Sequence, residues 1–161
     1  MIESVPIENQ YPSLQDYFTN ADDLRQLMVD LLGDVSNMDV LEPCAGDGAF
    51  IRDLRGRPRR IDAVDVHPPY IASLRNEFAS YVNAIQADFL ALFVDSPLLR
   101  KSTLLSRYDA VICNPPYGLQ IPLDYRRLLK SSFPGLYVRE SYGLFIHFSL
   151  ELLKNLGRYV F

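Results

Sequence analysis

The segment DVLEPCAGDGAF, residues 39–50, carries the clearest sign of the fold. A short apolar run, Asp39–Leu41, predicts a buried strand, and Ala49–Leu54 predicts the helix that follows it. Between them Gly46 and Gly48 remove side chains, so a ligand can approach the backbone closely. Such a turn is typical of nucleotide-binding α/β proteins. It lacks the third glycine of the dinucleotide pattern, however, and an ordinary tight turn explains it equally well.

Helices and strands alternate on both sides of this segment. Further strands are predicted at residues 61–66, 82–86, 108–113 and 159–161. Helices are predicted at residues 24–32, 68–78 and 89–93, and from residue 144 to near Gly157. The Pro- and Gly-rich stretch after residue 113 is predicted to be a loop. This order predicts an α/β, Rossmann-like fold with a parallel sheet and helices on both faces, and ligand sites just beyond the carboxyl ends of the strands.

The length and composition favour one folded domain. A chain of 161 residues, 48% of them hydrophobic, has room for a single sizeable core. Residues 1–20, with Pro6 and Pro12, are predicted to form an extended N-terminal arm. Because the sequence stops at an apolar strand, we expect a sheet truncated after its fifth strand. The length also leaves too little room for a separate substrate-recognition domain of ordinary size. The formal net charge of −4 gives no overall attraction to a phosphate backbone, so any nucleic-acid contact must come from local basic patches.

Metal, membrane and disulfide chemistry are not indicated. Cys44 and Cys113 lie in apolar runs of neighbouring predicted strands without a second pair, so we expect reduced core thiols. His67 and His147 have no ligand partners at metal spacing, which predicts no bound metal. No apolar run approaches the length of a membrane span, and no basic start precedes an apolar stretch. We therefore expect a cytoplasmic protein with no membrane partner.

Three carboxylates follow the first three predicted strands. Glu42, at the tip of the first strand, can accept a hydrogen bond from a cationic amino group. Asp65 ends the second strand, where its carboxylate can accept both ribose hydroxyls of an adenosine, as in NAD or S-adenosylmethionine. Asp88 can accept from an adenine amino group while the ring of Phe89 packs on the base. Alternatively, Asp88 caps the following helix and Phe89 fills the core.

The most specific pattern is Asn114-Pro115-Pro116-Tyr117, directly after the fourth predicted strand. The two prolines restrict the backbone, so the Asn114 side-chain oxygen and the Pro115 carbonyl can act as paired acceptors. Two acceptors fit the two hydrogens of a planar NH2 group and hold its nitrogen toward a methyl donor, which is catalysis by orientation and electrostatics. The alternative is a Pro-rich turn with a surface tyrosine, but its place after the fourth strand favours a ligand site.

The combination of Leu41–Phe50, Asp65, Asp88–Phe89 and Asn114–Tyr117 resembles the class I S-adenosylmethionine-dependent methyltransferases that act on amino nitrogens. Within that group the sequence is most similar to adenine-N6 DNA methyltransferases of restriction-modification systems. Tyr17-Phe18-Thr19 resembles the cofactor motif that precedes the glycine turn in one subgroup. The resemblance implies a catalytic domain over residues 1–161 with the target-recognition region absent, S-adenosylmethionine as cofactor and DNA as partner. It is also compatible with a fused or partner nuclease and recognition domain.

The resemblance further implies roles for individual residues. Thr19 would help hold the methionine carboxylate, Asp65 would bind the ribose, and Asp88 with Phe89 would bind the adenine; Val66 belongs to the same cofactor-binding set. The residues implied to contact the methionine part are Glu42, Pro43, Cys44, Ala45, Gly46, Gly48 and Phe50.

The implied catalytic residues are Asn114, Pro115, Pro116 and Tyr117. Asn114 would also touch the cofactor, and Tyr117 would stack on an adenine flipped out of the duplex. Phe145 is expected near the cofactor or target pocket. Asn20 departs from the proline usual after the threonine, and Asn155-Leu156-Gly157 departs from the usual glycine pair.

Several readings stay open at the level of sequence. A protein glutamine-N5 methyltransferase shares the Asn-Pro-Pro-Tyr turn, an RNA amino-group methyltransferase is a further candidate, and a non-catalytic cofactor-binding module is another. The placement of Thr19 and the Glu42–Gly46 turn favour DNA. One concentrated basic cluster is ambiguous between a solvated surface and phosphate contact, the solvated surface being favoured. It consists of Arg52, Arg55, Arg57, Arg59 and Arg60.

Overall fold

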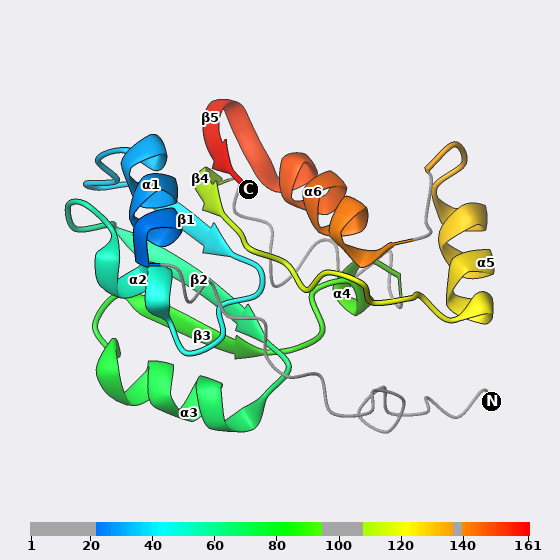
Figure 1. Cartoon of the computed structure of the whole chain (residues 1–161), viewed down its shortest axis with the longest axis horizontal. Coiled ribbons are helices and arrows are strands. Elements are labelled where there is room, and N and C mark those ends of the chain that lie inside the picture. The colour runs from blue at the N-terminus through cyan, green and yellow to red at the C-terminus, as the bar shows by residue number, and fades with distance from the viewer. Residues whose placement is uncertain (1–21, 95–107, 137–139) are drawn as a thin grey trace.

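One parallel five-stranded sheet forms the centre of the molecule (Figure 1), in the strand order β3-β2-β1-β4-β5. The computed structural model describes residues 22–94, 108–136 and 140–161. The strands are β1 (Asp39–Glu42), β2 (Arg60–Asp65), β3 (Val82–Gln86), β4 (Tyr108–Ile112) and β5 (Leu153–Val160). β1 lies between β2 and β4. The chain therefore adds β2 and β3 on one side of β1 and then β4 and β5 on the other side.

Helices cover both faces of the sheet, because successive residues of a strand point to opposite faces. Val40 packs in one core cluster and its neighbour Leu41 in the other. The helices whose buried residues join the Val40 cluster are α1 (Asp22–Leu32), α2 (Ala49–Asp53) and α3 (Pro68–Glu77). Those that join the Leu41 cluster are α4 (Ala91–Val94), α5 (Leu123–Ser132) and α6 (Ser141–Leu152). The predicted α/β fold with a doubly covered parallel sheet is confirmed.

The last helix and strand differ from the sequence-based expectation. Helix α6 ends at Leu152 and β5 starts at Leu153, so both a helix reaching Gly157 and a strand first beginning at Tyr159 are wrong. Leu153 pairs with Tyr108, and the next recorded pair joins Ala110 to Arg158, so extra residues of β5 loop out of register. Hydrogen bonding to β4 therefore outweighs the helical spacing of the leucines.

Two further boundaries differ. The stretch after residue 113, expected to be a loop throughout, contains α5, which buries Leu129 completely. The short helix expected at residues 89–93 begins instead at Ala91. None of the helices described is long and apolar enough to cross a membrane.

Candidate functional site

The carboxyl ends of β1 and β4 meet at the point where the chain changes direction across the sheet. Ligands of open α/β sheets bind at such a point. Val40 pairs with Ala110 and Leu41 with Val111, so the turn after Glu42 lies beside the residues after Ile112. The Sγ atoms of Cys44 and Cys113 are 3.4 Å apart, which brings the glycine turn and the catalytic candidates into direct contact.

Hydrogen bonds from neighbouring strands hold the glycine turn in place. The amide of Ala45 donates to the carbonyl of Val64 at 2.9 Å, and the amide of Gly46 donates to Oδ2 of Asp65 at 2.8 Å. Gly48 has a φ of 85°, a backbone conformation that favours glycine. A Cβ at Gly48 would lie 2.6 Å from Cδ2 of the buried Leu74 on α3, so a larger residue here would have to displace that side chain.

Asp65 connects the two loops that follow β1 and β2. Besides accepting from Gly46, its Oδ1 accepts the amide of His67 at 2.8 Å and lies 2.9 Å from Nδ1 of the same histidine. Its side chain is only 9% exposed. A carboxylate has about four lone-pair sites, so these contacts leave Oδ2 able to accept one hydroxyl group as well. The predicted ribose contact of Asp65 is compatible with this arrangement and stays a prediction, as does the contact expected of Val66, which is exposed.

Glu42 is a buried carboxyl group, and one of its oxygens has no hydrogen-bond partner among the described residues. It ends β1, is 1% exposed, and its Oε2 has no hydrogen-bond partner within the part of the chain that the structure describes. Burial raises the pKa of Glu42 well above its ordinary value, and the nearby Cys44 and Asp65 side chains raise it further. A cationic donor at this position would supply both the missing hydrogen bond and the missing charge. The residues thus fit the ammonium group that the sequence predicted beside Glu42.

In the segment after β3, Asp88 caps a helix and Phe89 lies in the core, and the adenine contact expected of these two residues stays a prediction. Oδ1 of Asp88 accepts the amides of Leu90 at 2.8 Å and Ala91 at 3.3 Å, so Asp88 caps the start of α4. Phe89 is 2% exposed and stacks on Phe145 with ring centroids 5.4 Å apart. Both aromatic rings therefore belong to the core. The amide of Ala87 donates to the carbonyl of Asp65 at 3.0 Å, which keeps this segment at the same sheet edge as the rest of the site.

The Asn114–Tyr117 turn is anchored at both ends and presents its tyrosine to the surface. The amide of Cys113 donates to the carbonyl of Val160, and the hydroxyl of Ser141 donates to the carbonyl of Pro116 at 2.9 Å. Pro115 is buried, whereas Tyr117 is 50% exposed. The convergence of the Asn114 side chain and the Pro115 carbonyl on one point stays a prediction.

Two aromatic side chains beside Tyr117 were not identified from the sequence. The ring centroid of Tyr142, at the start of α6, lies 6.1 Å from that of Tyr117, and that of Phe161 lies 6.5 Å from it. The only sequence signal for Tyr142 was its place at the start of an apolar helix. Phe161 was assigned to the strand without a role.

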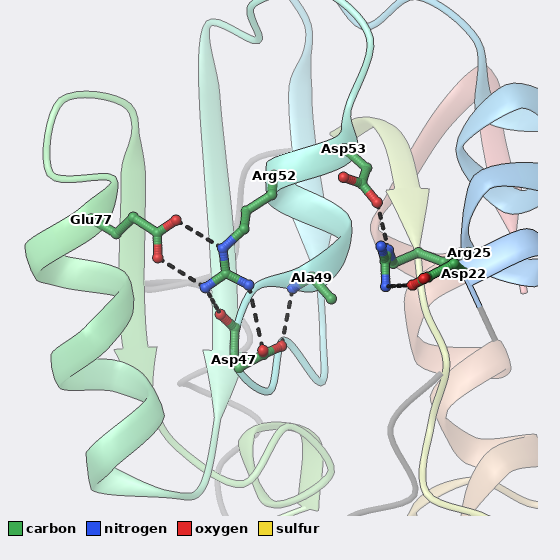
Figure 2. A network of polar contacts seen from close by, with 7 residues as sticks. All are labelled: Asp22, Arg25, Asp47, Ala49, Arg52, Asp53 and Glu77. Atoms are coloured by element: carbon green, nitrogen blue, oxygen red, sulfur yellow. Dashed lines mark hydrogen bonds and ion pairs between the residues drawn. The ribbon is translucent and has the colours of Figure 1, made fainter. Parts of the chain in front are cut away.

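The arginines of the basic cluster are engaged within the protein. Arg52 forms two hydrogen bonds of 2.8 Å with the carboxylate of Glu77 on α3, and its Nη2 donates to the carbonyl of Asp47 (Figure 2). The other pairs are Arg55 with Asp30, Arg59 with Asp39, Arg60 with Asp62, and Arg57 over the ring of Tyr81. These contacts favour the solvated, structural interpretation of the cluster over phosphate binding.

Two further sequence-based expectations concern the role of Thr19 and the absence of a bound metal. Thr19 lies outside the described residues. Within residues 22–94, 108–136 and 140–161, no three His, Cys, Asp or Glu side chains gather in a way that could hold a metal ion.

Solved structures of other proteins share this architecture. A protein from Listeria monocytogenes, assigned as a class I S-adenosylmethionine-dependent methyltransferase, superposes with a TM-score of 0.64 at 18% identity, over 91% of this chain and 46% of its own. The chain has the class I methyltransferase fold. It spans about half the length of that protein. The sequence matches no protein-family model and no curated protein sequence.

Other structures with the class I methyltransferase fold differ in what they do. A modification subunit assigned to a type I restriction enzyme from Vibrio vulnificus superposes with a TM-score of 0.61 at 19% identity, over 82% of this chain and 30% of its own. Precorrin 8w decarboxylase from Methanobacterium thermoautotrophicum superposes with a TM-score of 0.57 at 16% identity, over 88% of this chain and 62% of its own. The fold therefore leaves the substrate open, and the residues at the site must indicate it.

Proposed function

We propose that the chain is the catalytic core of an enzyme that transfers a methyl group from S-adenosylmethionine to the N6 amino group of adenine in DNA, as part of a restriction-modification system. The observation that carries this proposal is the contact between the two turns. The Asn114–Tyr117 turn follows β4 directly beside the Glu42–Gly48 turn that follows β1, at the ligand-binding edge of the sheet. In this proposal the amino-group acceptor and the cofactor-binding turn would thus share one site.

The cofactor would be held by groups from three strands. S-adenosylmethionine, when bound, supplies a methyl group on a positively charged sulfur. Glu42 would accept a hydrogen bond from the methionine ammonium group, which would give its buried Oε2 the partner that it lacks in the described structure. Asp65 would accept the ribose hydroxyls. The adenine would lie beside Asp88, and Thr19 would hold the methionine carboxylate.

Catalysis would rest on orientation of the target nitrogen. The Asn114 side-chain oxygen and the Pro115 carbonyl would each accept one hydrogen of the adenine amino group, which aims the nitrogen lone pair at the methyl group. These acceptors also stabilise the positive charge that develops on the nitrogen during transfer. Tyr117 would stack on the flipped base, and its 50% exposure agrees with that role.

The DNA substrate has a specific supporting observation and a specific competitor. The modification subunit assigned to a type I restriction enzyme from Vibrio vulnificus shares the fold. Target recognition and DNA cleavage would then belong to a fused or partner domain. The competitor is a protein glutamine side chain, whose planar amide also carries an NH2 group. The intramolecular pairing of the basic cluster favours this second candidate, because it removes the most obvious phosphate contacts.

Two measurements test the proposal in sequence. First, calorimetric titration of the chain with S-adenosylmethionine and, separately, with NAD is expected to give binding of the former alone. Second, the longest form of the protein that contains this chain is incubated with radiolabelled S-adenosylmethionine and unmethylated DNA, RNA or a Gln-containing peptide. Label in DNA that is recovered as N6-methyladenine, and its loss on Asn114→Ala with cofactor binding retained, is expected. Label in the peptide alone would reassign the substrate, and retained activity in Asn114→Ala would reject the catalytic turn.

A further inference from the structure

Two free thiols meet between the cofactor turn and the catalytic turn. Cys44 lies in the turn after β1, Cys113 directly follows β4, and their sulfur atoms are 3.4 Å apart. A disulfide bond needs about 2.05 Å between the sulfurs, so closure requires an approach of only about 1.4 Å.

The two thiols differ in access. Cys44 is partly exposed, whereas Cys113 is completely buried. Burial raises the pKa of the Cys113 thiol, and the neighbouring Cys44 raises it further. An oxidant from solution therefore meets Cys44 first, and Cys113 is placed to react only with a modified Cys44.

We propose that Cys44 and Cys113 form an oxidative modification site, at which a small hydroperoxide converts the two thiols into one disulfide. The Cys44 thiolate attacks hydrogen peroxide, takes one oxygen to become a sulfenic acid, and releases hydroxide, which is protonated to water. The Cys113 sulfur then attacks the Cys44 sulfur, the S–OH bond breaks, and the Cys113 proton leaves with the hydroxyl as a second water. Two thiols and one peroxide thus give one disulfide and two waters.

The disulfide would alter the cofactor site, a consequence that rests on the proposed function. Cys44 lies two residues after Glu42 and two before Gly46, whose amide is bonded to Asp65. Cys113 immediately precedes Asn114. Drawing the two sulfurs together displaces the backbone that would hold the methionine part, so the oxidised protein binds S-adenosylmethionine about tenfold or more weakly, a loss of about 1.4 kcal/mol.

The covalent step is tested without reference to activity. The folded chain is treated with equimolar hydrogen peroxide, denatured, and analysed by intact mass and by thiol labelling. The expected result is loss of two hydrogen atoms and of both reactive thiols, reversed by dithiothreitol. Cys113→Ser and Cys113→Ala are expected to trap the sulfenic acid on Cys44, detected as a dimedone adduct, and Cys44→Ser is expected to leave Cys113 as a free thiol. Free thiols in the treated wild type, or sulfinic acid without a disulfide, overturn the proposal.

The effect on the cofactor is measured on the same samples. Calorimetric titration with S-adenosylmethionine compares reduced, oxidised and re-reduced protein. Weaker binding only in the oxidised sample is expected, and equal binding in all three rejects the coupling to the cofactor site. Absence of binding in the reduced, folded protein rejects the proposed cofactor and the coupling together, while the thiol measurement still decides whether the disulfide forms.

Discussion

The backbone amide of Gly46 donates a hydrogen bond of 2.8 Å to Oδ2 of Asp65, which ties the turn after β1 to the end of β2. The other oxygen of the same carboxylate accepts the amide of His67. One side chain therefore shapes both loops before any ligand arrives, and in our proposal it also accepts the ribose. Removal of the Asp65 side chain should therefore lower the affinity for the cofactor more than it lowers the stability of the fold.

We expect Asp65→Ala to weaken binding of S-adenosylmethionine about tenfold or more, equivalent to about 1.4 kcal/mol, because both the loop contacts and the ribose acceptor are lost. Asp65→Asn keeps the size and one acceptor oxygen, so it should lie between the alanine variant and the wild type. Calorimetric titration measures all three. Asp124→Ala, which removes a carboxyl 94% exposed on α5, serves as a control with unchanged affinity. Equal affinities for Asp65→Ala and wild type would contradict the ribose assignment.

Glu42 should make the stability of the ligand-free protein depend on pH. Burial raises the pKa of Glu42 well above its ordinary value, so the folded state keeps its proton at pH values where the unfolded chain has lost it. The contribution to the free energy of unfolding is therefore fully present below the unfolded-state pKa of about 4.3 and is lost as the pH rises toward the folded-state pKa.

The variant Glu42→Gln removes this titration while keeping the side-chain shape. Urea unfolding at a series of pH values is expected to show that the variant gains stability relative to wild type as the pH rises through that window. The same variant should bind S-adenosylmethionine more weakly, because a neutral amide replaces the partner of the ammonium group. Parallel stability profiles would show that Glu42 titrates alike in the folded and unfolded chain.

The pair of Arg52 and Glu77 joins α2 to α3 through two hydrogen bonds, with Asp47 as a further partner (Figure 2). The side chains are 38% and 41% exposed, so solvent weakens the interaction. A double-mutant cycle with Arg52→Ala and Glu77→Ala is expected to give a favourable coupling energy that decreases as salt is added. The single contact between Arg127 and Asp124, whose side chains are 70% and 94% exposed, should show a smaller coupling in the same assay. A coupling no larger than that control would mean that the geometry is not maintained in solution.

The sequence was informative where a buried strand is bounded by clear breaks. The predicted strand at residues 82–86 has the bounds of β3, and the strand predicted at residues 61–66 differs from β2 by one residue at each end. These are short apolar runs next to prolines, glycines or polar residues. The end of α6 lacked such a break, because Leu152 and Leu153 continue the helical spacing, and only pairing with Tyr108 on β4 sets the boundary.

Site residues were predictable as positions at strand ends, but not as contacts. Asp88 carried two interpretations, and the cap that it forms with Leu90 is a local geometry that spacing cannot separate from a ligand contact. Cys44 and Cys113 were expected in neighbouring strands, yet the 3.4 Å approach of their sulfur atoms depends on the register between β1 and β4. Register arises from long-range pairing, which periodicity within one segment does not specify.

Tyr117 offers a test that separates base binding from cofactor binding. Stacking of a base on an aromatic ring contributes about 1–3 kcal/mol, so Tyr117→Ala should lower kcat/KM for DNA by about 5- to 150-fold. Its affinity for S-adenosylmethionine should be unchanged, because we assign the half-exposed ring to the target base and not to the cofactor. Tyr117→Phe keeps the ring and should retain most of the activity, and Leu31→Ala, at a 67% exposed position on α1, serves as a surface control. A drop in kcat/KM of equal size for the phenylalanine variant would assign the effect to the hydroxyl, and unchanged kcat/KM in Tyr117→Ala would remove the tyrosine from the target pocket.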